Sequence, residues 1–518
     1  MARVASIMIL GVLMAVWATA TATSSPSRSS AAALSSLGVS LPPGEVLVGN
    51  AGYTCSLLSR VFPKNETFTD TSPYYDVLID EAWSQNCRLN ASCVVTPDSA
   101  HEVSRLLQIL SILDTKFAIR SGGHNTNPGF SSIDHNGVLI ALEKLNTISI
   151  SSDRGTVTVG PGNKWESVYN YLQPYNVTVL GGRAAVVGVG GYILGGGTFY
   201  NTHGLAIDSV TRFQVVLPNG NIVNATATEH ADLYKGLKGG LSNFGIVTEY
   251  DLTTNTGIDV LYHINTYTIA NTPAVFAAYA TYLLDADINS NIEIQANPNF
   301  TLVFFGYLGH VSTPAAFDRF SDIPVASTMY PPTNGSLSDL LLTIGSAGLT
   351  SEGVSYGGTF TFKVTGPTFL QDTYSNYLEA AASLTSGVVL SYVPQGVIPN
   401  LVTQGKSQNG GNLLGLEATP QLLSYSGVNI FAQFPVTVNQ KVVMRAVDTL
   451  LASLTSSAKS RGLFLPYIFV NDAGPSQKPL QSLGERNINY IDTVAKRYDP
   501  EGVMQKLQNQ AYFVSKEL

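Results

Sequence analysis

Charged residues are scarce in this chain of 518 residues: Asp, Glu, Lys and Arg make up 12% of it, against 44% hydrophobic residues. The formal net charge is -8, and no segment forms a basic stripe that could neutralise phosphates. Nucleic acid is therefore not an expected partner. The length and the apolar content instead predict two large folded domains rather than a disordered chain.

Cysteine is also rare. The three cysteines, Cys55, Cys87 and Cys93, all lie near the start of the chain. Their spacing fits none of the usual zinc patterns and no histidine cluster lies beside them, so no metal site is expected. An oxidising compartment favours one disulfide and one leftover thiol. We favour the pair Cys55–Cys93, and Cys55–Cys87 stays open as the alternative.

Long apolar runs are missing except at the N-terminus. The run from Ile7 to Trp17 follows a basic residue and precedes small residues with a cleavage pattern near Ala20 or Ala22. It is too short for a transmembrane helix and is typical of a secretory signal peptide over residues 1–22, with an N-terminal anchor as the alternative. No later segment could cross a membrane, so we predict a secreted or secretory-pathway protein with no membrane contact after cleavage. Residues 23–45 are predicted to be a disordered linker.

Secretory targeting gives meaning to the sequons of the type Asn-x-Ser/Thr. In a secreted chain, exposed sequons accept N-linked glycans. The sequence contains six of them, at Asn65, Asn90, Asn176, Asn224, Asn299 and Asn334. We predict glycans at these positions.

Two common nucleotide-binding motifs are absent: there is no G-x-G-x-x-G at the first strand-to-helix turn and no G-x-x-x-x-G-K-S/T. Their absence disfavours a Rossmann or P-loop site. Among the 47 glycines of the chain, three clusters stand out, in loops that span residues 120–124, 181–197 and 239–247. Because glycine lets the backbone approach a ligand and offer N–H groups to an anion, the loops predict a backbone cradle for a pyrophosphate.

Hydrophobic periodicity predicts an α+β fold. Strands and helices of a first domain include a helix that opens at Ser99, where Glu102 has capping-box spacing, a helix over residues 165–172 and a strand over residues 178–180. From about residue 257 the segments lengthen, and we predict a second α+β domain built on an antiparallel sheet. Its expected strands and helix cover residues 292–295, 301–305, 358–364 and 375–385.

Four signatures in a fixed order resemble the berberine-bridge-enzyme-like family of FAD-linked oxidases, within the class that has a vanillyl-alcohol-oxidase or PCMH-type FAD domain. They are Arg120 to His124, Val187 to Gly197, Asn243 to Val247, and the tail with Asn471-Asp472-Ala473, Asn487 and Lys496 to Pro500. The resemblance implies three parts of the chain. These are a PCMH-type FAD-binding domain over 46–256, a substrate-binding domain over 257–465 and a C-terminal segment over 466–518 that completes the FAD domain.

The same resemblance implies that His124 carries FAD through a covalent bond to the 8α carbon of the flavin. Such a bond raises the reduction potential of the flavin and prevents its loss outside the cell. The other residues expected to bind the cofactor are Arg120, Ser121, Gly122, Gly123, Gly181, Gly182, Val187, Gly188, Gly190, Gly191, Gly196, Gly197, Gly245, Ile246, Val247 and Asn471.

The chain departs from the family at one position. Many members bind the flavin a second time, through a cysteine four residues before the G-V-G-G run, and here that position is Ala184. We therefore expect one histidyl link and no cysteinyl link, with a less open substrate cleft and a lower potential. Val187 occupies the place where a small side chain admits O2 in the family, which predicts O2 as electron acceptor and H2O2 as product. Simple core packing of Val187 is the alternative.

Catalytic residues are the least determined part of the prediction. Tyr200 resembles a tyrosine near the flavin ring in relatives, and Tyr467 and Tyr392 are further tyrosines that could act. Glu417 is the carboxylate that we assign as a base. Gln395 stands where sugar-oxidising members place an acidic residue.

Residues 260–423 hold few charges, which favours a small hydrophobic substrate such as a polyketide- or alkaloid-like alcohol. Secretion favours an oligosaccharide, which is the alternative. A dehydrogenase that passes its electrons to a quinone or dye is a further alternative for the activity. A hypothesis of a different class is a secreted flavin-carrying or glycan-binding protein with little turnover.

Overall fold

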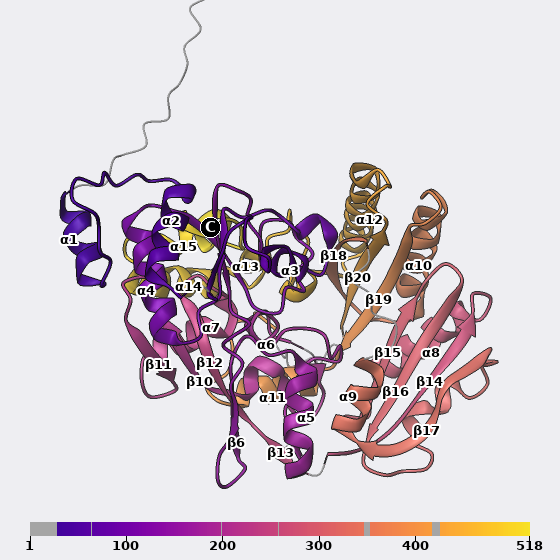
Figure 1. Cartoon of the computed structure of the whole chain (residues 1–518). Coiled ribbons are helices and arrows are strands. Elements are labelled where there is room, and N and C mark those ends of the chain that lie inside the picture. The colour runs from indigo at the N-terminus through magenta and orange to yellow at the C-terminus, as the bar shows by residue number, and fades with distance from the viewer. Residues whose placement is uncertain (1–27, 64, 198, 257, 346–352, 417–424) are drawn as a thin grey trace, which may run out of the picture.

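The computed structural model describes residues 28–518 apart from residues 64, 198, 257, 346–352 and 417–424. The chain forms two lobes (Figure 1). Among the residues described, no helix has both the length and the apolar character needed to span a bilayer. The predicted signal peptide over residues 1–22 lies outside the described residues.

A small mixed sheet begins the first lobe. Three of its four strands are parallel, which requires a crossover connection, and α4 (Ala100–Ile112) supplies one between β2 and β3. The Ser99 hydroxyl accepts the Glu102 N–H at 3.4 Å and caps this helix, as the sequence predicts. In spatial order the strands are β1 (Thr67–Phe68), β2 (Cys93–Val95), β4 (Gly137–Ala141) and β3 (Lys116–Arg120).

A second, antiparallel sheet of five strands completes the first lobe. The C-terminal tail returns to it, since α14 (Glu485–Tyr498) packs on α7 (Ala231–Gly240). The carboxylate of Asp232 in α7 accepts the Tyr498 hydroxyl of α14 at 2.8 Å. In spatial order the strands are β11 (Ile222–Thr226), β10 (Val210–Val216), β12 (Ile246–Thr253), β6 (Thr156–Val159) and β5 (Ile148–Ile150).

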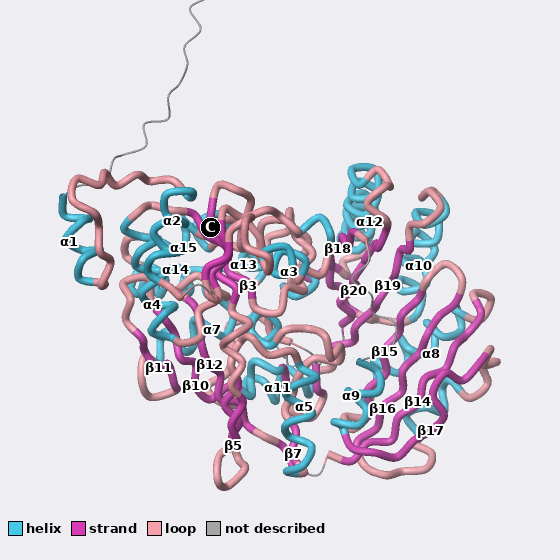
Figure 2. Tube along the Cα trace, in the orientation of Figure 1, coloured by secondary structure: helices cyan, strands magenta, loops and turns pink. Residues whose placement is uncertain are grey.

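The second lobe is built on one antiparallel sheet of eight strands. Helices α8 (Thr272–Leu284), α10 (Pro367–Ala382) and α12 (Gln440–Ser460) cover one face of it (Figure 2). In spatial order the strands are β17 (Ser327–Ser336), β14 (Asp259–Thr268), β16 (Phe300–Leu308), β15 (Ser290–Ala296), β19 (Val389–Val397), β20 (Tyr425–Phe434), β18 (Val354–Lys363) and β21 (Phe464–Leu465). The α+β class and the antiparallel second sheet are as predicted.

The other face of this sheet contacts the first lobe. Along β15, Ile292 and Ile294 are buried in the core, whereas Glu293 between them pairs with Arg183 of the first lobe. Because side chains alternate along a strand, the polar residues of the central strands are gathered between the two lobes. The candidate site lies at this junction.

Two local expectations were wrong. The segment expected to be a disordered linker contains α1 (Arg28–Ser36), which packs on α4 because Leu34 is fully buried and Arg105 donates to the Leu37 carbonyl at 2.8 Å. Its alanines also favour a helix. A strand expected over residues 178–180 ends at Thr178, because its partner β13 (Asn255–Thr256) offers only two residues for pairing.

The cysteines are paired as predicted. Cys55 of α2 (Ala51–Val61) is bonded to Cys93 of β2, with 5.8 Å between the Cα atoms. Cys87 is free and buried, and burial raises the pKa of its thiol to about 12. The thiol therefore stays protonated at ordinary pH.

Candidate active site

The first and second glycine loops pack backbone against backbone. A β-carbon on Gly122 would lie 2.3 Å from the Cα atom of Gly188, so neither position can carry a side chain. Ser121 joins the loops further, because its hydroxyl donates to the Pro161 carbonyl and accepts the Gly190 N–H at 3.2 Å. The two signatures thus form one rigid unit.

His124 lies at the end of the first loop and stacks on Trp83, with 4.4 Å between ring centroids. The Trp83 N–H donates to the carbonyl of Gly123 at 2.9 Å, and Gly123 has a φ of +70°, which favours glycine. Burial, assisted by the charge of Lys164, lowers the pKa of His124 to about 4. Its imidazole is therefore neutral at physiological pH, and its Nε2 is buried without a hydrogen-bond partner among the described residues.

The second loop begins over an aromatic platform. A β-carbon on Gly181 would lie 2.3 Å from the ring of Trp165, and one on Gly182 would lie 2.6 Å from it. The hydroxyls of Tyr169 and Tyr192 donate to the carbonyls of Gly182 and Gly181, at 2.8 and 3.1 Å. Side-chain packing thus fixes the path of the loop.

The glycine turn that ends the second loop is held by the tail of the chain. Gly196 and Gly197 have φ values of +105° and +76°, a region that favours glycine. The Asn471 side chain accepts the Gly197 N–H and donates to the Tyr192 carbonyl, both at 3.3 Å. The Asn471 side chain therefore stabilises the conformation of the loop.

Arg120 is a buried anchor. Its guanidinium donates to the Leu78 carbonyl at 2.5 Å and lies 3.9 Å from the Glu143 carboxylate. Its Nη2 is buried and has no hydrogen-bond partner within the described chain. Burial lowers the pKa of Arg120, and the opposing charge of Glu143 raises it.

The third glycine loop lies deeper. A β-carbon on Gly245 would lie 2.3 Å from the Val216 carbonyl oxygen, and Ile246 and Val247 are buried in β12. Their side chains pack in the cores, so any contact with a cofactor would come from the backbone.

The loops fit a flavin dinucleotide. Two buried polar atoms, His124 Nε2 and Arg120 Nη2, have no hydrogen-bond partner in the described part of the chain, as is expected where a ligand is bound. Gly191 is exposed, and a β-carbon there would meet no atom within 4 Å. His124, the backbone of both loops and the tail clamp Asn471 would hold the cofactor.

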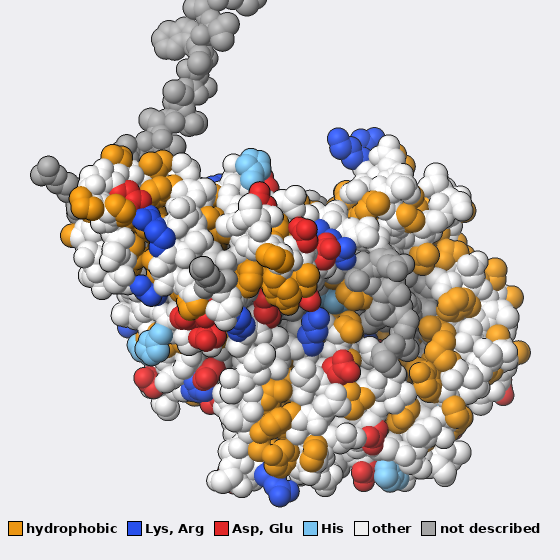
Figure 3. All heavy atoms as spheres, in the orientation of Figure 1, with side chains coloured by type: hydrophobic (Ala, Val, Ile, Leu, Met, Phe, Trp, Pro, Cys, Tyr) orange, Lys and Arg blue, Asp and Glu red, His pale blue; other side chains and the backbone are white. Residues whose placement is uncertain are grey.

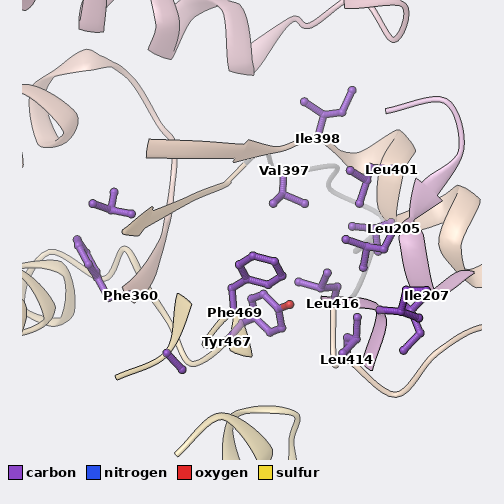
Figure 4. Packing of buried hydrophobic residues seen from close by; sticks show 14 of the residues in the cluster. Leu205, Ile207, Phe360, Val397, Ile398, Leu401, Leu414, Leu416, Tyr467 and Phe469 are labelled. Carbon is purple, nitrogen blue, oxygen red and sulfur yellow. The ribbon is translucent and has the colours of Figure 1, made fainter. Parts of the chain in front are cut away.

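A small cavity with polar residues in its wall, here called the polar cavity, opens between the lobes. Figure 4 shows Tyr467 and Phe469 side by side, with Val397 above their rings and Leu416 to the right. The cavity is lined by Thr359, Thr361, Gln395, Val397, Gly427, Tyr467, Phe469 and Asp472.

A chain of polar contacts borders this cavity. Arg183 forms an ion pair with Glu293 and donates to the amide oxygen of Gln395 at 3.2 Å. The Gln395 amide donates to Asp472 at 2.9 Å. Burial raises the pKa of Asp472 to about 6, although Arg183 and Gln395 both oppose the shift.

A second, larger cavity lies between the turn at residues 201–203 and the far strands of the sheet. Apolar side chains of β14, β16 and α9 (Leu337–Gly345) make up most of its wall. His203 also lines this cavity, and its Nδ1 lies 2.7 Å from the Thr202 hydroxyl. Burial lowers the pKa of His203. Its apolar lining residues are Ile258, Val260, Ile288, Phe304, Leu308, Leu337 and Leu340.

Comparison with known proteins places this geometry in a family. Residues 91–226 match the family model described as FAD binding domain. The chain is 80% identical over 517 residues to the FAD-dependent monooxygenase macF of Penicillium terrestre, covering 98% of this chain and 99% of that protein. It belongs to the FAD-dependent oxidoreductases of the berberine-bridge-enzyme-like family.

Other members and neighbours agree with this assignment. The FAD-dependent monooxygenase yanF of Aspergillus niger is 66% identical over 503 residues, which cover 96% of this chain and 84% of that protein. The xylooligosaccharide oxidase of Myceliophthora thermophila in complex with xylobiose shares the fold, with a TM-score of 0.72 and 18% identity over 86% of this chain and 96% of that one. BBE-like 1 of Physcomitrella patens does so with a TM-score of 0.71 and 18% identity over 84% and 95%.

The berberine-bridge-enzyme-like chain differs from one structural neighbour in its flavin-binding loop. The glucooligosaccharide oxidase of Acremonium strictum carries a 6-S-cysteinyl, 8α-N1-histidyl FAD. Here Ala184 has no sulfur to offer, and it is half-buried beside Ala185. Val187 is also half-buried and packs against the core, while its carbonyl accepts the Trp165 N–H at 3.1 Å.

The expected catalytic residues are distributed unevenly. Tyr467 lines the polar cavity. Tyr200 lies in β8 (Phe199–Tyr200), but its side chain is outside the described part of the chain, as is Glu417. Tyr392 was a wrong suggestion: its ring is buried among aromatic residues under the helices, and its hydroxyl bonds to Thr373 at 2.6 Å.

Sequence reasoning missed the polar network. Arg183, Glu293 and Asp472 lie more than 100 residues apart in sequence, so no local motif joins them. The scarcity of charged residues in this part of the chain could have pointed to the network. Charged side chains that lie alone in an apolar segment are usually paired or functional.

Proposed function

We propose that this chain is a secreted oxidoreductase that holds FAD covalently on His124 and oxidises an alcohol carbon of a small hydrophobic metabolite, with O2 as acceptor. The observation that carries the proposal is the neutral imidazole of His124, whose Nε2 is buried without a hydrogen-bond partner among the described residues beside the glycine cradle. An unprotonated imidazole has the lone pair that a covalent bond requires. When bound, the flavin supplies the redox chemistry: it takes a hydride from the substrate and passes the electrons to O2.

The protein orients the partners of that reaction. The Ser121 and Asn471 contacts hold the cradle, and Tyr467 and Asp472 line the cavity where a hydroxyl would bind. A group that holds or accepts a proton must lie within hydrogen-bond reach of the reacting hydroxyl.

A hydrophobic substrate is supported by the second cavity and by the surface of the second lobe. Figure 3 shows charged side chains gathered mainly over the first lobe, with few on the visible face of the second. Binding pockets for apolar molecules are lined in the same way, with a few polar groups to fix orientation. The oligosaccharide alternative draws on the structural neighbours, whose low identity supports the fold alone.

The test is substrate-dependent O2 consumption by the purified holoenzyme with a panel of aromatic and allylic alcohols and with xylo- and cello-oligosaccharides. We expect one H2O2 for each hydrophobic alcohol oxidised, and none from a His124→Ala variant that lacks flavin. Turnover of the oligosaccharides alone would contradict the substrate class. Absence of turnover with every compound would favour the flavin-carrying protein.

A second candidate function is monooxygenation, because the relatives macF and yanF are named FAD-dependent monooxygenases. A monooxygenase inserts one atom of O2 and needs two electrons from an external reductant such as NADPH. Reactions under 18O2 separate the two functions: label in the organic product supports the monooxygenase, and label in H2O2 supports the oxidase. If reduced flavin stays reduced in air, the acceptor is instead a quinone or dye.

A further inference from the structure

We propose that Asp472 accepts the proton of the substrate's hydroxyl, with Gln395 and Arg183 as positioning residues. This inference rests on the proposed function and assigns a base to it. Asp472 lines the polar cavity and is only partly buried, so its carboxylate is accessible from the cavity.

Donor and acceptor chemistry fixes the orientation of Gln395. A guanidinium has only donors, so the amide oxygen of Gln395 must face Arg183, at 3.2 Å. The amide nitrogen must then face Asp472, at 2.9 Å. The ion pair with Glu293 in turn holds Arg183 in place. A chain of contacts that begins at Glu293 in the second lobe thus holds Asp472 in position.

The neighbouring charges leave Asp472 as the acceptor. Arg183 and Glu293 are paired with each other, which leaves the Asp472 carboxylate as the acidic group that faces the cavity. Two tyrosines, Tyr192 and Tyr279, also lie near enough to the network to interact with the charge of Arg183. No second carboxylate lines the cavity among the described residues.

Thr361 supplies a second polar atom in the same cavity. Its side chain is 2% exposed, and its Oγ1 has no hydrogen-bond partner among the residues that the structure describes. A buried hydroxyl without a partner is costly unless a ligand satisfies it. Thr361 and Asp472 together could bind one substrate oxygen, as donor and acceptor.

The position of the carboxylate is also chemically informative. In the sugar-oxidising members that the sequence resembles, an acidic residue stands where this chain has Gln395. Here an amide occupies that place and the acid lies at the other end of the same hydrogen bond. An acid is therefore present beside the cavity, at Asp472.

The proton step is balanced within this site. The O–H bond of the substrate breaks, a new O–H bond forms on the Asp472 carboxylate, and the proton leaves to solvent after product release. The oxidant of the alcohol carbon is the flavin of the proposed function. A carboxyl with a pKa of about 6 is mostly ionised at pH 7 and can accept the proton.

The experiment measures anaerobic flavin reduction by cinnamyl alcohol as a function of pH in the holoenzyme. For the wild type we expect the rate to rise with pH to a plateau above about 6. Asp472→Asn is expected to lower the rate by roughly 100-fold or more and to remove that step. The double variant Gln395→Glu/Asp472→Asn moves the acid to the other end of the hydrogen bond. Its flavin reduction rate should be at least about tenfold higher than that of Asp472→Asn. Asp448→Asn, on the outer helix α12, is the matched control and should keep the wild-type profile.

A readout independent of turnover is the melting temperature against pH. Because the folded-state pKa of Asp472 is raised above its ordinary value of 3.8, the folded wild type gains a proton, and relative stability, as pH falls from 7 towards 4. Asp472→Asn lacks this gain, so the two melting temperatures should change relative to each other over that range. A constant difference would overturn the assignment.

Failure of the function and failure of the inference are distinguishable. If no alcohol reduces the wild-type flavin, the proposed function and the role of Asp472 in it both fall. If the wild type reacts and Asp472→Asn keeps its rate and pH profile, only the assignment of Asp472 is overturned.

Discussion

At the scale of single residues, glycines in the same loops have different tasks. Gly188 faces the backbone of Gly122 so closely that a methyl group cannot be added, whereas Gly191 faces open space. The first kind of glycine holds two loops together, and the second leaves room. The G-V-G-G signature contains both kinds.

Gly188→Ala should therefore loosen the two loops. The new β-carbon would lie 2.4 Å from the Gly122 Cα atom, and overpacking of this type costs about 1–3 kcal/mol of unfolding free energy. Denaturant unfolding of the holoprotein measures the change. Gly191→Ala is the matched control and should unfold like the wild type within about 1 kcal/mol. Equal stability of the two variants would contradict the close packing.

Val187→Leu tests the route of O2. If Val187 admits O2 to the flavin, the larger leucine should slow reoxidation of the reduced enzyme about tenfold, equivalent to about 1.4 kcal/mol of barrier. Stopped-flow mixing of reduced enzyme with aerated buffer measures the rate, and Val187→Ala should not slow it. An unchanged rate in Val187→Leu would leave core packing as the role of this residue.

Roles could be proposed for single residues only where a local signature carried them. His124 ends a five-residue motif, so a role could be proposed for it before its stacking on Trp83 was known, and that role stays a prediction. Asp472 could not be assigned in this way. Its partner Gln395 lies 77 residues away, and the contact exists only after β19 and the tail meet.

At the scale of elements, the tail is part of the cofactor lobe. The segment after β21 leaves the large sheet and returns to the first lobe, where Asn471 bonds the glycine turn and Asn243 accepts the Val514 N–H at 3.0 Å. The Asn127 amide donates to the Ala473 carbonyl at 2.9 Å. Loops of the first lobe thus depend on residues that the chain supplies last.

Asn471→Ala should weaken this dependence. The variant loses two hydrogen bonds to the turn, which are worth about 1–2 kcal/mol together. We expect a lower melting temperature and incomplete flavin incorporation, measured from the ratio of flavin to protein absorbance. Asn489→Ala, exposed on α14, is the control and should retain both. Full flavin content in Asn471→Ala would contradict the clamp.

Elements with strong periodicity were predicted well. The helix α5 (Trp165–Leu172) has the bounds expected from its sequence, and α4 begins at its Ser99 cap. The helix α1 was missed because its short Ser/Ala-rich sequence shows no clear amphipathic pattern, and its packing on α4 through Leu34 joins segments far apart in the sequence. Strand pairing across the large sheet could not be read from local sequence, because it joins distant segments.

At the scale of the whole molecule, all six sequons lie at the surface and none lies in the interior. All six sequon asparagines are exposed, although they come from both lobes. Asn176 lies at a turn with a φ of +54°, and Asn334 lies in the edge strand β17. Exposure satisfies the physical requirement for glycan attachment, and use of the sites remains a prediction.

Expression of the full chain in a fungal host tests secretion and glycosylation together. We expect the protein in the medium, with its N-terminus beyond residue 20 and a mass that falls on treatment with an endoglycosidase. Replacing all six asparagines by glutamine should abolish that shift. A protein that stays in the cytosol with the mass of its bare chain would contradict the secretory assignment.

The covalent flavin on His124 is the central claim, and in-gel flavin fluorescence after acid denaturation tests it most directly. Wild-type protein and His124→Ala are denatured, separated by electrophoresis and imaged before staining. The account predicts fluorescence that stays with the wild-type band and is absent from the His124→Ala band. A dark wild-type band with free flavin in the supernatant would contradict the covalent link, and a wild-type protein without any flavin would contradict the oxidoreductase itself.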